Sequence, residues 1–140
     1  MTAGYSGTPL PRKLGIRDQS RVAILGGPDG FEALLAPLPE GVTVRHQARG
    51  VLDVVVLFVT RAAELDRRFP VAAGRLDEAG GLWVAWPKKT SGLATDLNFD
   101  IVRTTGLEAG LVDNKVCAID ETWSGLRFVI RREDRQSKRK

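Results

Sequence analysis

Residues 52–59 read LDVVVLFV, a run in which seven of eight side chains are apolar. A strand with this pattern must be buried on both faces, because neither face carries a row of polar side chains. Such a strand is typical of the centre of a parallel sheet that helices cover on each side. The run therefore predicts an α/β domain with these residues in the middle of the sheet.

Two shorter strands are predicted before the central one. Residues 21–25, RVAIL, are mostly apolar and are followed by two glycines. We expect a tight turn there and then a short helix over residues 30–36, with Asp29 as its N-cap. Residues 42–46 alternate apolar and polar side chains, which predicts a half-buried strand.

A helix and another buried strand are predicted after the central one. Residues 60–76 carry apolar side chains at helical spacing, and we expect Pro70 to kink or split this helix. The glycines at 80–81 are expected to end it. Residues 82–86, LWVAW, predict a buried strand whose ladder stops at Pro87.

The last third predicts one more helix and a hairpin. The helix ends at Gly106, and either Thr95 or Asp96 is placed to cap its start. Residues 111–119 and 126–131 are the last two predicted strands. The six residues between them are too few for a crossover helix, so this pair must be antiparallel.

Right-handed crossovers turn this order of elements into one architecture. We predict a three-layer, Rossmann-like, mostly parallel and doubly wound sheet of about six strands that ends in an antiparallel hairpin. The predicted spatial order of the strands is 42–46, 21–25, 52–59, 82–86, 126–131 and 111–119.

Length and charge suggest one domain with a basic tail. The chain has 140 residues and a net charge of +4. Residues 131–140 hold six basic and two acidic residues, which accounts for the whole net charge. We expect an irregular arm over 1–12, a single domain over 13–132 and a disordered basic tail over 133–140. Such a tail favours weak, non-specific contact with nucleic acid.

Cellular location is predicted from what the sequence lacks. Cys117 is the only cysteine, so no disulfide forms within the chain. The first residues contain no apolar run of signal-peptide length, and no apolar stretch is long enough for a membrane span. We therefore expect a cytoplasmic protein that makes no membrane contact.

The predicted layout resembles a shortened class I methyltransferase fold over residues 20–131. Such enzymes usually carry an acidic residue just before a GxGxG turn and another at the end of the second strand. Here the first turn reads ILGGPDG, and the second strand ends in Arg45 and His46. The resemblance implies the fold, but these positions do not carry the carboxylates that hold adenosylmethionine.

Several short segments of the sequence resemble a bacterial family known as domain of unknown function 3052. These segments are KLGI, GGPDGF, VVVLFVT, LWVAWPKK and GLVDNKVCAIDETWSGLRFVIRR, in that order between residues 8 and 132. The resemblance implies no activity and assigns no catalytic residue.

A ligand site is predicted at the carboxyl edge of the sheet, where crossovers leave neighbouring strands in opposite directions. The glycine turn exposes backbone N–H groups suited to a phosphate or carboxylate, and the loop KKTSG adds two lysines and two hydroxyls. A planar ligand has a neighbouring tryptophan to stack on. The predicted ligand-binding residues are Gly26, Gly27, Asp29, Gly30, Thr60, Arg61, Trp86, Lys88, Lys89, Thr90 and Ser91.

Each of these groups also has a purely structural interpretation. The glycines fit a tight turn in which Asp29 caps the next helix, and a carboxylate there repels an anion. The lysines fit a solvated loop that contacts nothing. Both interpretations stay open at the level of sequence.

Other reactive side chains give weaker signals. His46 is the only histidine, so any histidine-dependent catalytic site must use it. Cys117 fits a small core residue, and the scattered acids make no metal-ligand spacing. Asp120 and Glu121 are adjacent on an extended segment, so their side chains point in opposite directions rather than forming a carboxylate pair.

Two functions remain open. The first is a non-catalytic binding or regulatory module with a degenerate ligand pocket, acting on a protein partner or a small ligand. The second is a methyltransferase-like, transferase-type enzyme that binds a nucleotide-like or anionic ligand between the GGPDG and KKTSG segments. The sequence assigns no cofactor, no metal and no catalytic residue.

Overall fold

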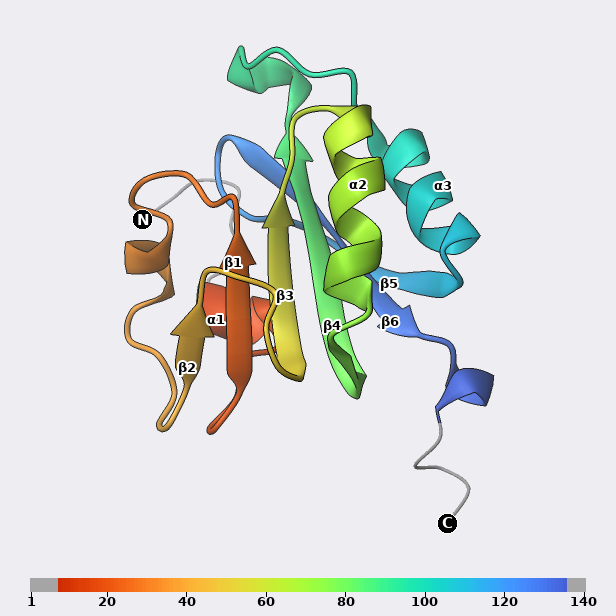
Figure 1. The fold of residues 1–140 in the computed structure, drawn as a ribbon. Coiled ribbons are helices and arrows are strands. Elements are labelled where there is room, and N and C mark those ends of the chain that lie inside the picture. The colour runs from red at the N-terminus through yellow and green to blue at the C-terminus, as the bar shows by residue number, and fades with distance from the viewer. Residues whose placement is uncertain (1–7, 136–140) are drawn as a thin grey trace.

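A single mixed sheet forms the centre of the computed structural model, which describes residues 8–135. Its six strands lie in the order β2-β1-β3-β4-β6-β5 (Figure 1). Their bounds are β1 Arg21–Leu25, β2 Thr43–Arg45, β3 Leu52–Phe58, β4 Leu76–Pro87, β5 Leu111–Ala118 and β6 Trp123–Ile130.

The strand directions confirm the predicted α/β architecture. β2, β1, β3 and β4 are parallel, whereas β6 is antiparallel to both β4 and β5. The spatial order matches the predicted one, and the hairpin closes the sheet as expected. Seven strand residues of β3 lie in the middle, and all but one are buried.

Helices and single helical turns cover the two faces unequally. α2 (Ala62–Ala73) and α3 (Phe99–Glu108) lie on one face, as Figure 1 shows. The opposite face is covered by the short α1 (Leu10–Leu14) and by η1 (Glu32–Leu35), a single 3-10 turn. Two further 3-10 turns are η2 (Lys89–Ser91) and η3 (Arg132–Asp134).

Each face buries its own apolar cluster. On the α2 side, Phe69 and Phe128 meet edge to face with ring centroids 5.3 Å apart. On the other side, the indole N–H of Trp83 donates a 3.0 Å hydrogen bond to the carbonyl of Leu14, the last residue of α1. Both Trp83 and Leu14 are fully buried, so this bond ties α1 to the middle of the sheet.

The short helix predicted after β1 is wrong in length and in its cap. η1 is one turn that starts at Glu32, and no side chain caps it. Asp29 is exposed and lies before the N-cap position, which Phe31 occupies. Pro37 and Pro39 follow too soon for a longer helix to form.

The predicted split of the helix at Pro70 and the predicted helix end at 80–81 are also wrong. α2 continues through Pro70 to Ala73, where the exposed proline costs one hydrogen bond near the end of the helix. β4 already begins at Leu76. Gly80 therefore lies inside β4. A glycine is needed at this position, because a Cβ atom there would lie 2.7 Å from the carbonyl oxygen of Asp53.

The predicted start of the third helix and the predicted termini need correction too. Asn98 caps α3 by accepting a 2.9 Å hydrogen bond from the amide of Ile101, which neither Thr95 nor Asp96 does. Residues 10–12 are helical rather than irregular. Arg132–Asp134 form a turn where the disordered tail was predicted to begin, and the arm over 1–7 and the tail over 136–140 lie outside the described residues.

The two edges of the sheet are irregular. β2 is only three residues long. In β5 the pairing with β6 shifts between Asp113 and Lys115, so Asn114 is an extra residue in the ladder.

An ion pair joins the starts of β1 and β3 and makes stability depend on pH. The Asp53 carboxylate accepts hydrogen bonds of 2.7 and 2.9 Å from the amide and Nε of Arg21. These bonds to Arg21 hold the pKa of Asp53 below its ordinary value. The pair therefore stabilises the fold above the unfolded-state pKa, and this contribution is lost as pH falls through the folded-state pKa.

We expect Asp53→Asn to lower the free energy of unfolding by about 1 kcal/mol at pH 7, because water partly screens the exposed Arg21. The difference from the natural sequence should shrink below about pH 4, as measured by urea unfolding at several pH values. Asp77→Asn is the control, since Asp77 is 3.8 Å from Arg21 and should matter less. A difference that stays constant down to pH 2 would contradict the assignment.

Candidate functional site

The glycine turn after β1 packs tightly against the end of β3. Gly26 has a φ of +69°, and a Cβ atom there would lie 3.0 Å from the carbonyl oxygen of Phe58. A Cβ atom on Gly27 would lie 2.7 Å from the Ile24 side chain. Both glycines are nevertheless exposed on their outer side. The turn therefore has a structural reason for its glycines and also leaves backbone accessible to a ligand.

Arg68 of α2 reaches this turn and was missed at the level of sequence. Its Nη1 atom would lie 3.0 Å from a Cβ atom on Gly26, and it forms a 3.6 Å ion pair with Glu64 on the preceding turn of the helix. The guanidinium is partly exposed. Arg67 precedes it in sequence, so only the packing of α2 on the sheet distinguishes the two. Arg68 therefore places a cation beside the glycine turn, which the sequence predicts to bind an anion.

The polar groups after β3 are largely engaged by the chain itself. Thr60 donates its amide to Glu64, and its carbonyl accepts a 2.6 Å hydrogen bond from the Thr95 hydroxyl. The first amide of α2, at Ala62, donates to the Asp96 carboxylate at 2.7 Å. Arg61 is exposed. Asp96 thus occupies the helix N-terminus and disfavours an anion there.

The KKTSG loop follows β4, whereas the glycine turn follows β1. The strand β3 lies between these two strands in the sheet. The amide of Lys88 donates to the carbonyl of Thr122, and Lys89, Thr90 and Ser91 form the η2 turn. Trp86 is only 6 % exposed and belongs to the core cluster on the α2 side, so its ring is not free to stack on a ligand.

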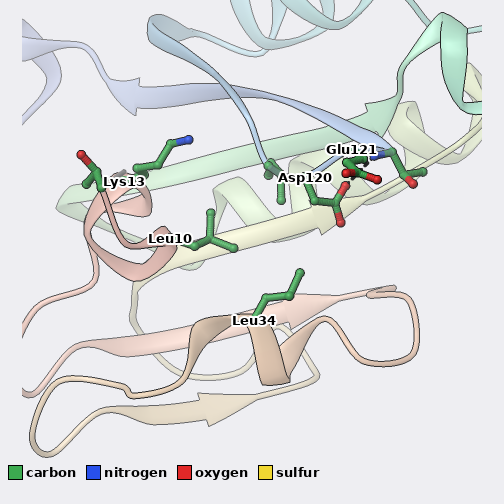
Figure 2. Close-up of a pocket in the computed structure, with 8 residues that line it drawn as sticks. Leu10, Lys13, Leu34, Asp120 and Glu121 are labelled. Carbon is green, nitrogen blue, oxygen red and sulfur yellow. Dashed lines mark hydrogen bonds between the residues drawn. The ribbon is translucent and has the colours of Figure 1, made fainter. Parts of the chain in front are cut away.

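A cavity of about 410 Å³ opens on the thinly covered face of the sheet. Figure 2 shows Leu10 of α1 and Leu34 of η1 between Lys13 and the carboxylates of Asp120 and Glu121. Thr8, Ile119 and Thr122 complete the lining. The cavity therefore has apolar walls between a basic and an acidic side.

The chain fixes the polar groups of this cavity through local hydrogen bonds. Lys13 Nζ donates to the carbonyl of Ala118 at 3.4 Å. One oxygen of Asp120 accepts the amides of Thr122 and Trp123, each at 2.8 Å, and so holds the β5–β6 turn. Glu121 is exposed, and its carboxylate lies beside that of Asp120 at the cavity (Figure 2). That the two acids do not form a carboxylate pair stays a prediction.

A row of buried aromatic rings lies between the glycine turn and the β5–β6 turn. The ring centroids of Phe31 and Phe58 are 4.8 Å apart, and those of Phe58 and Trp123 are 5.0 Å apart, both edge to face. Phe31 precedes η1, and Trp123 begins β6. The row connects the two segments that carry the cavity and keeps them in fixed positions.

The predicted site and the cavity share an edge of the sheet but not their residues. Four cavities lie among residues 8–135, this one included, whose linings contain none of the eleven predicted ligand-binding residues. The cavity between α1, η1 and the β5–β6 turn was missed because its walls come from segments more than 80 residues apart in sequence.

The remaining reactive side chains are placed as follows. His46 is exposed, and its Nε2 lies 2.8 Å from Glu32 Oε1. Cys117 is partly buried against the α1 side of the core, and this burial raises the pKa of its thiol. Within residues 8–135 no group of three or more histidine, cysteine or acidic side chains is arranged to hold a metal ion.

Comparison with solved structures identifies the fold. The chain is similar to a magnesium protoporphyrin IX methyltransferase from Synechocystis with bound SAH (14% identity, TM-score 0.57), covering 81% of this chain and 75% of that one. It is equally similar to Aeropyrum pernix fibrillarin with bound S-adenosyl-L-methionine (14% identity, TM-score 0.57), covering 90% and 70%. These likenesses show a Rossmann-like, methyltransferase-like fold.

Another similar structure is an O-methyltransferase from neocarzinostatin biosynthesis in complex with S-adenosylmethionine (12% identity, TM-score 0.57). The match covers 81% of this chain and 49% of that one, so the chain spans about half of that enzyme. No family model and no curated protein matches the chain, so its resemblance to domain of unknown function 3052 is not confirmed. No helix among the described residues is long and apolar enough to cross a membrane.

Proposed function

We propose that the protein is a transferase-type protein that binds a nucleotide-like ligand at the carboxyl edge of its sheet. The observation that carries this proposal is the position of Arg68 beside the exposed glycine turn of a methyltransferase-like fold. Open α/β sheets bind their ligands at this edge. Backbone N–H groups and a guanidinium are a suitable pair for an anionic group of such a ligand.

The cavity beside this edge supplies room for a second substrate. Its acidic side, Asp120 and Glu121, suits a cationic or hydrogen-bond-donating group, while Leu10 and Leu34 suit an apolar one. Group transfer needs a donor and an acceptor bound at the same time. The turn and the cavity supply two separate places for them, which a single degenerate pocket does not.

A non-catalytic binding module is the second candidate, and one observation favours it. β2 ends in Arg45 and is followed by His46, where adenosylmethionine-dependent enzymes of the resembled fold carry a carboxylate. A module of this kind binds one small ligand or a protein partner. The two candidates differ in whether the turn and the cavity are filled together.

The test measures the melting temperature of the full chain with S-adenosylmethionine, S-adenosylhomocysteine, ATP and NADP. A ligand that binds the folded state stabilises it by about 2.7 kcal/mol at a hundredfold excess over Kd. We expect at least one of the four to raise the melting temperature. For that ligand, Arg68→Ala should weaken binding about tenfold or more, because a charge-assisted hydrogen bond contributes about 1.5–3 kcal/mol.

Arg67→Ala is the matched control, because it removes the same charge from the neighbouring position of α2. If none of the four ligands raises the melting temperature, or if both variants bind equally well, the proposed site is wrong. Given binding, a second ligand found simultaneously at the Asp120 cavity by NMR fragment screening supports the transferase over the module.

The finer expectations from the sequence remain proposals. These are membership of domain of unknown function 3052, a single domain over 13–132, a cytoplasmic location and weak nucleic-acid contact by the basic tail. The lysines of the KKTSG loop remain proposed anion contacts, since neither Lys88 nor Lys89 forms an ion pair within 4.0 Å with another of residues 8–135.

A further inference from the structure

A second cavity, of about 640 Å³, lies at the end of β2 and is lined by Arg45, His46, Gln47, Arg49 and Gly50. Three of these five residues have basic side chains, and none is acidic. Glu32, which is outside the lining, contacts His46 at 2.8 Å. Such a lining selects an anion.

The loop is built around the Arg45 side chain. Nη1 of Arg45 donates a 2.8 Å hydrogen bond to the carbonyl of Arg49, which holds the guanidinium across the loop. A Cβ atom on Gly50 would lie 2.6 Å from the same nitrogen, and Gly50 has a φ of +70°. Arg45 is thus fixed in position, and its guanidinium has further N–H donors for a ligand.

The position of this loop relates it to the proposed nucleotide site. Arg45 is paired with Ala23 of β1, three residues before the glycine turn. Ala48 packs on the α2 side of the core, so the β2–β3 connection crosses β1 on the face that carries Arg68 (Figure 1). The contact between His46 and Glu32 joins the end of β2 to η1, which follows the glycine turn.

The end of the second strand is where doubly wound sheets recognise a ribose. An aspartate or glutamate there binds a free 2′-hydroxyl, whereas a nearby arginine accommodates a phosphate in its place. Here the strand ends in Arg45, and Arg49 follows in the same cavity. Two guanidinium groups match the geometry of a phosphomonoester, which accepts paired hydrogen bonds.

We propose that the Arg45–Arg49 cavity binds a phosphate carried on the 2′ or 3′ oxygen of the ribose of an adenine nucleotide. The inference rests on the proposed function, because it deepens the identity of the same nucleotide-like ligand. It also explains why the carboxylate expected at this position is replaced by basic side chains. A ribose with free hydroxyls, as in S-adenosylmethionine, is then the weaker ligand.

The experiment measures the affinity of the full chain for adenosine, 5′-AMP, 2′-AMP and 3′-AMP by calorimetry at one ionic strength. We expect 2′-AMP or 3′-AMP to bind at least tenfold more tightly than 5′-AMP, which carries the same phosphate at another oxygen. Arg45→Ala and Arg49→Ala should each remove most of this preference. Arg67→Ala, a charge-matched change on α2, should leave it unchanged.

Arg49→Ala guards the test against misfolding, because Arg49 is exposed and, within residues 8–135, its guanidinium donates only one long hydrogen bond, to Gln47 at 3.5 Å. If 5′-AMP binds as tightly as 2′-AMP and 3′-AMP, or if both arginine variants keep the preference, this inference is overturned and the proposed function stands. If none of the four compounds binds while S-adenosylmethionine does, the inference again fails alone. If no adenine compound binds at all, the proposed function fails with it.

Discussion

Replacing Gly106 by alanine is expected to lower the free energy of unfolding by about 2 kcal/mol. Gly106 is buried in α3, and a Cβ atom there would overlap the edge of the Phe128 ring. Phe128 is fully buried and is held by its edge-to-face contact with Phe69, so it has little room to move. Overpacking of this kind costs about 1–3 kcal/mol or more and exceeds the helix-propensity gain of about 1 kcal/mol.

Urea unfolding of the variant and of Thr104→Ala measures this effect. Thr104 lies on the exposed face of the same helix, so its replacement by alanine should leave stability unchanged or slightly raised. A Gly106→Ala variant as stable as the natural sequence would show that α3 does not approach the sheet as closely as described.

Trp83→Phe is expected to cost about 2–3 kcal/mol, because it removes the hydrogen bond to Leu14 and leaves a buried carbonyl without its partner. The smaller ring also leaves a void in the core. Amide hydrogen exchange over α1 should become faster, since α1 loses its link to β4. Trp86→Phe makes the same chemical change in the same strand, and we expect a smaller loss and no effect on α1.

Much of the fold follows from local sequence pattern. The apolar run of β3 sets the centre of the sheet, and the short connection between β5 and β6 requires an antiparallel end. Right-handed crossovers then leave one spatial order for the strands. These features depend on residues that are close in sequence, and therefore the strand order was predictable.

The predictions that were wrong or missing concern contacts between segments that are distant in sequence. Asp96 looks like a helix cap in sequence, and it does bind a helix amide, but the amide belongs to α2 rather than to α3. Gly80 looks like a stop signal, whereas it allows close approach to β3. Arg68 cannot be distinguished from Arg67 until α2 is packed on the sheet. Local propensity says little about such contacts.

The irregular edges of the sheet bear on how the protein behaves at high concentration. β2 is too short to template a partner strand, and the extra residue Asn114 interrupts the outer ladder of β5 next to the charged Lys115. Val116, an exposed apolar residue, directly follows Lys115 in this strand. Bulges and charges on an edge strand oppose edge-to-edge pairing between molecules. The fold thus carries its own protection against fibrillar aggregation at both ends of the sheet.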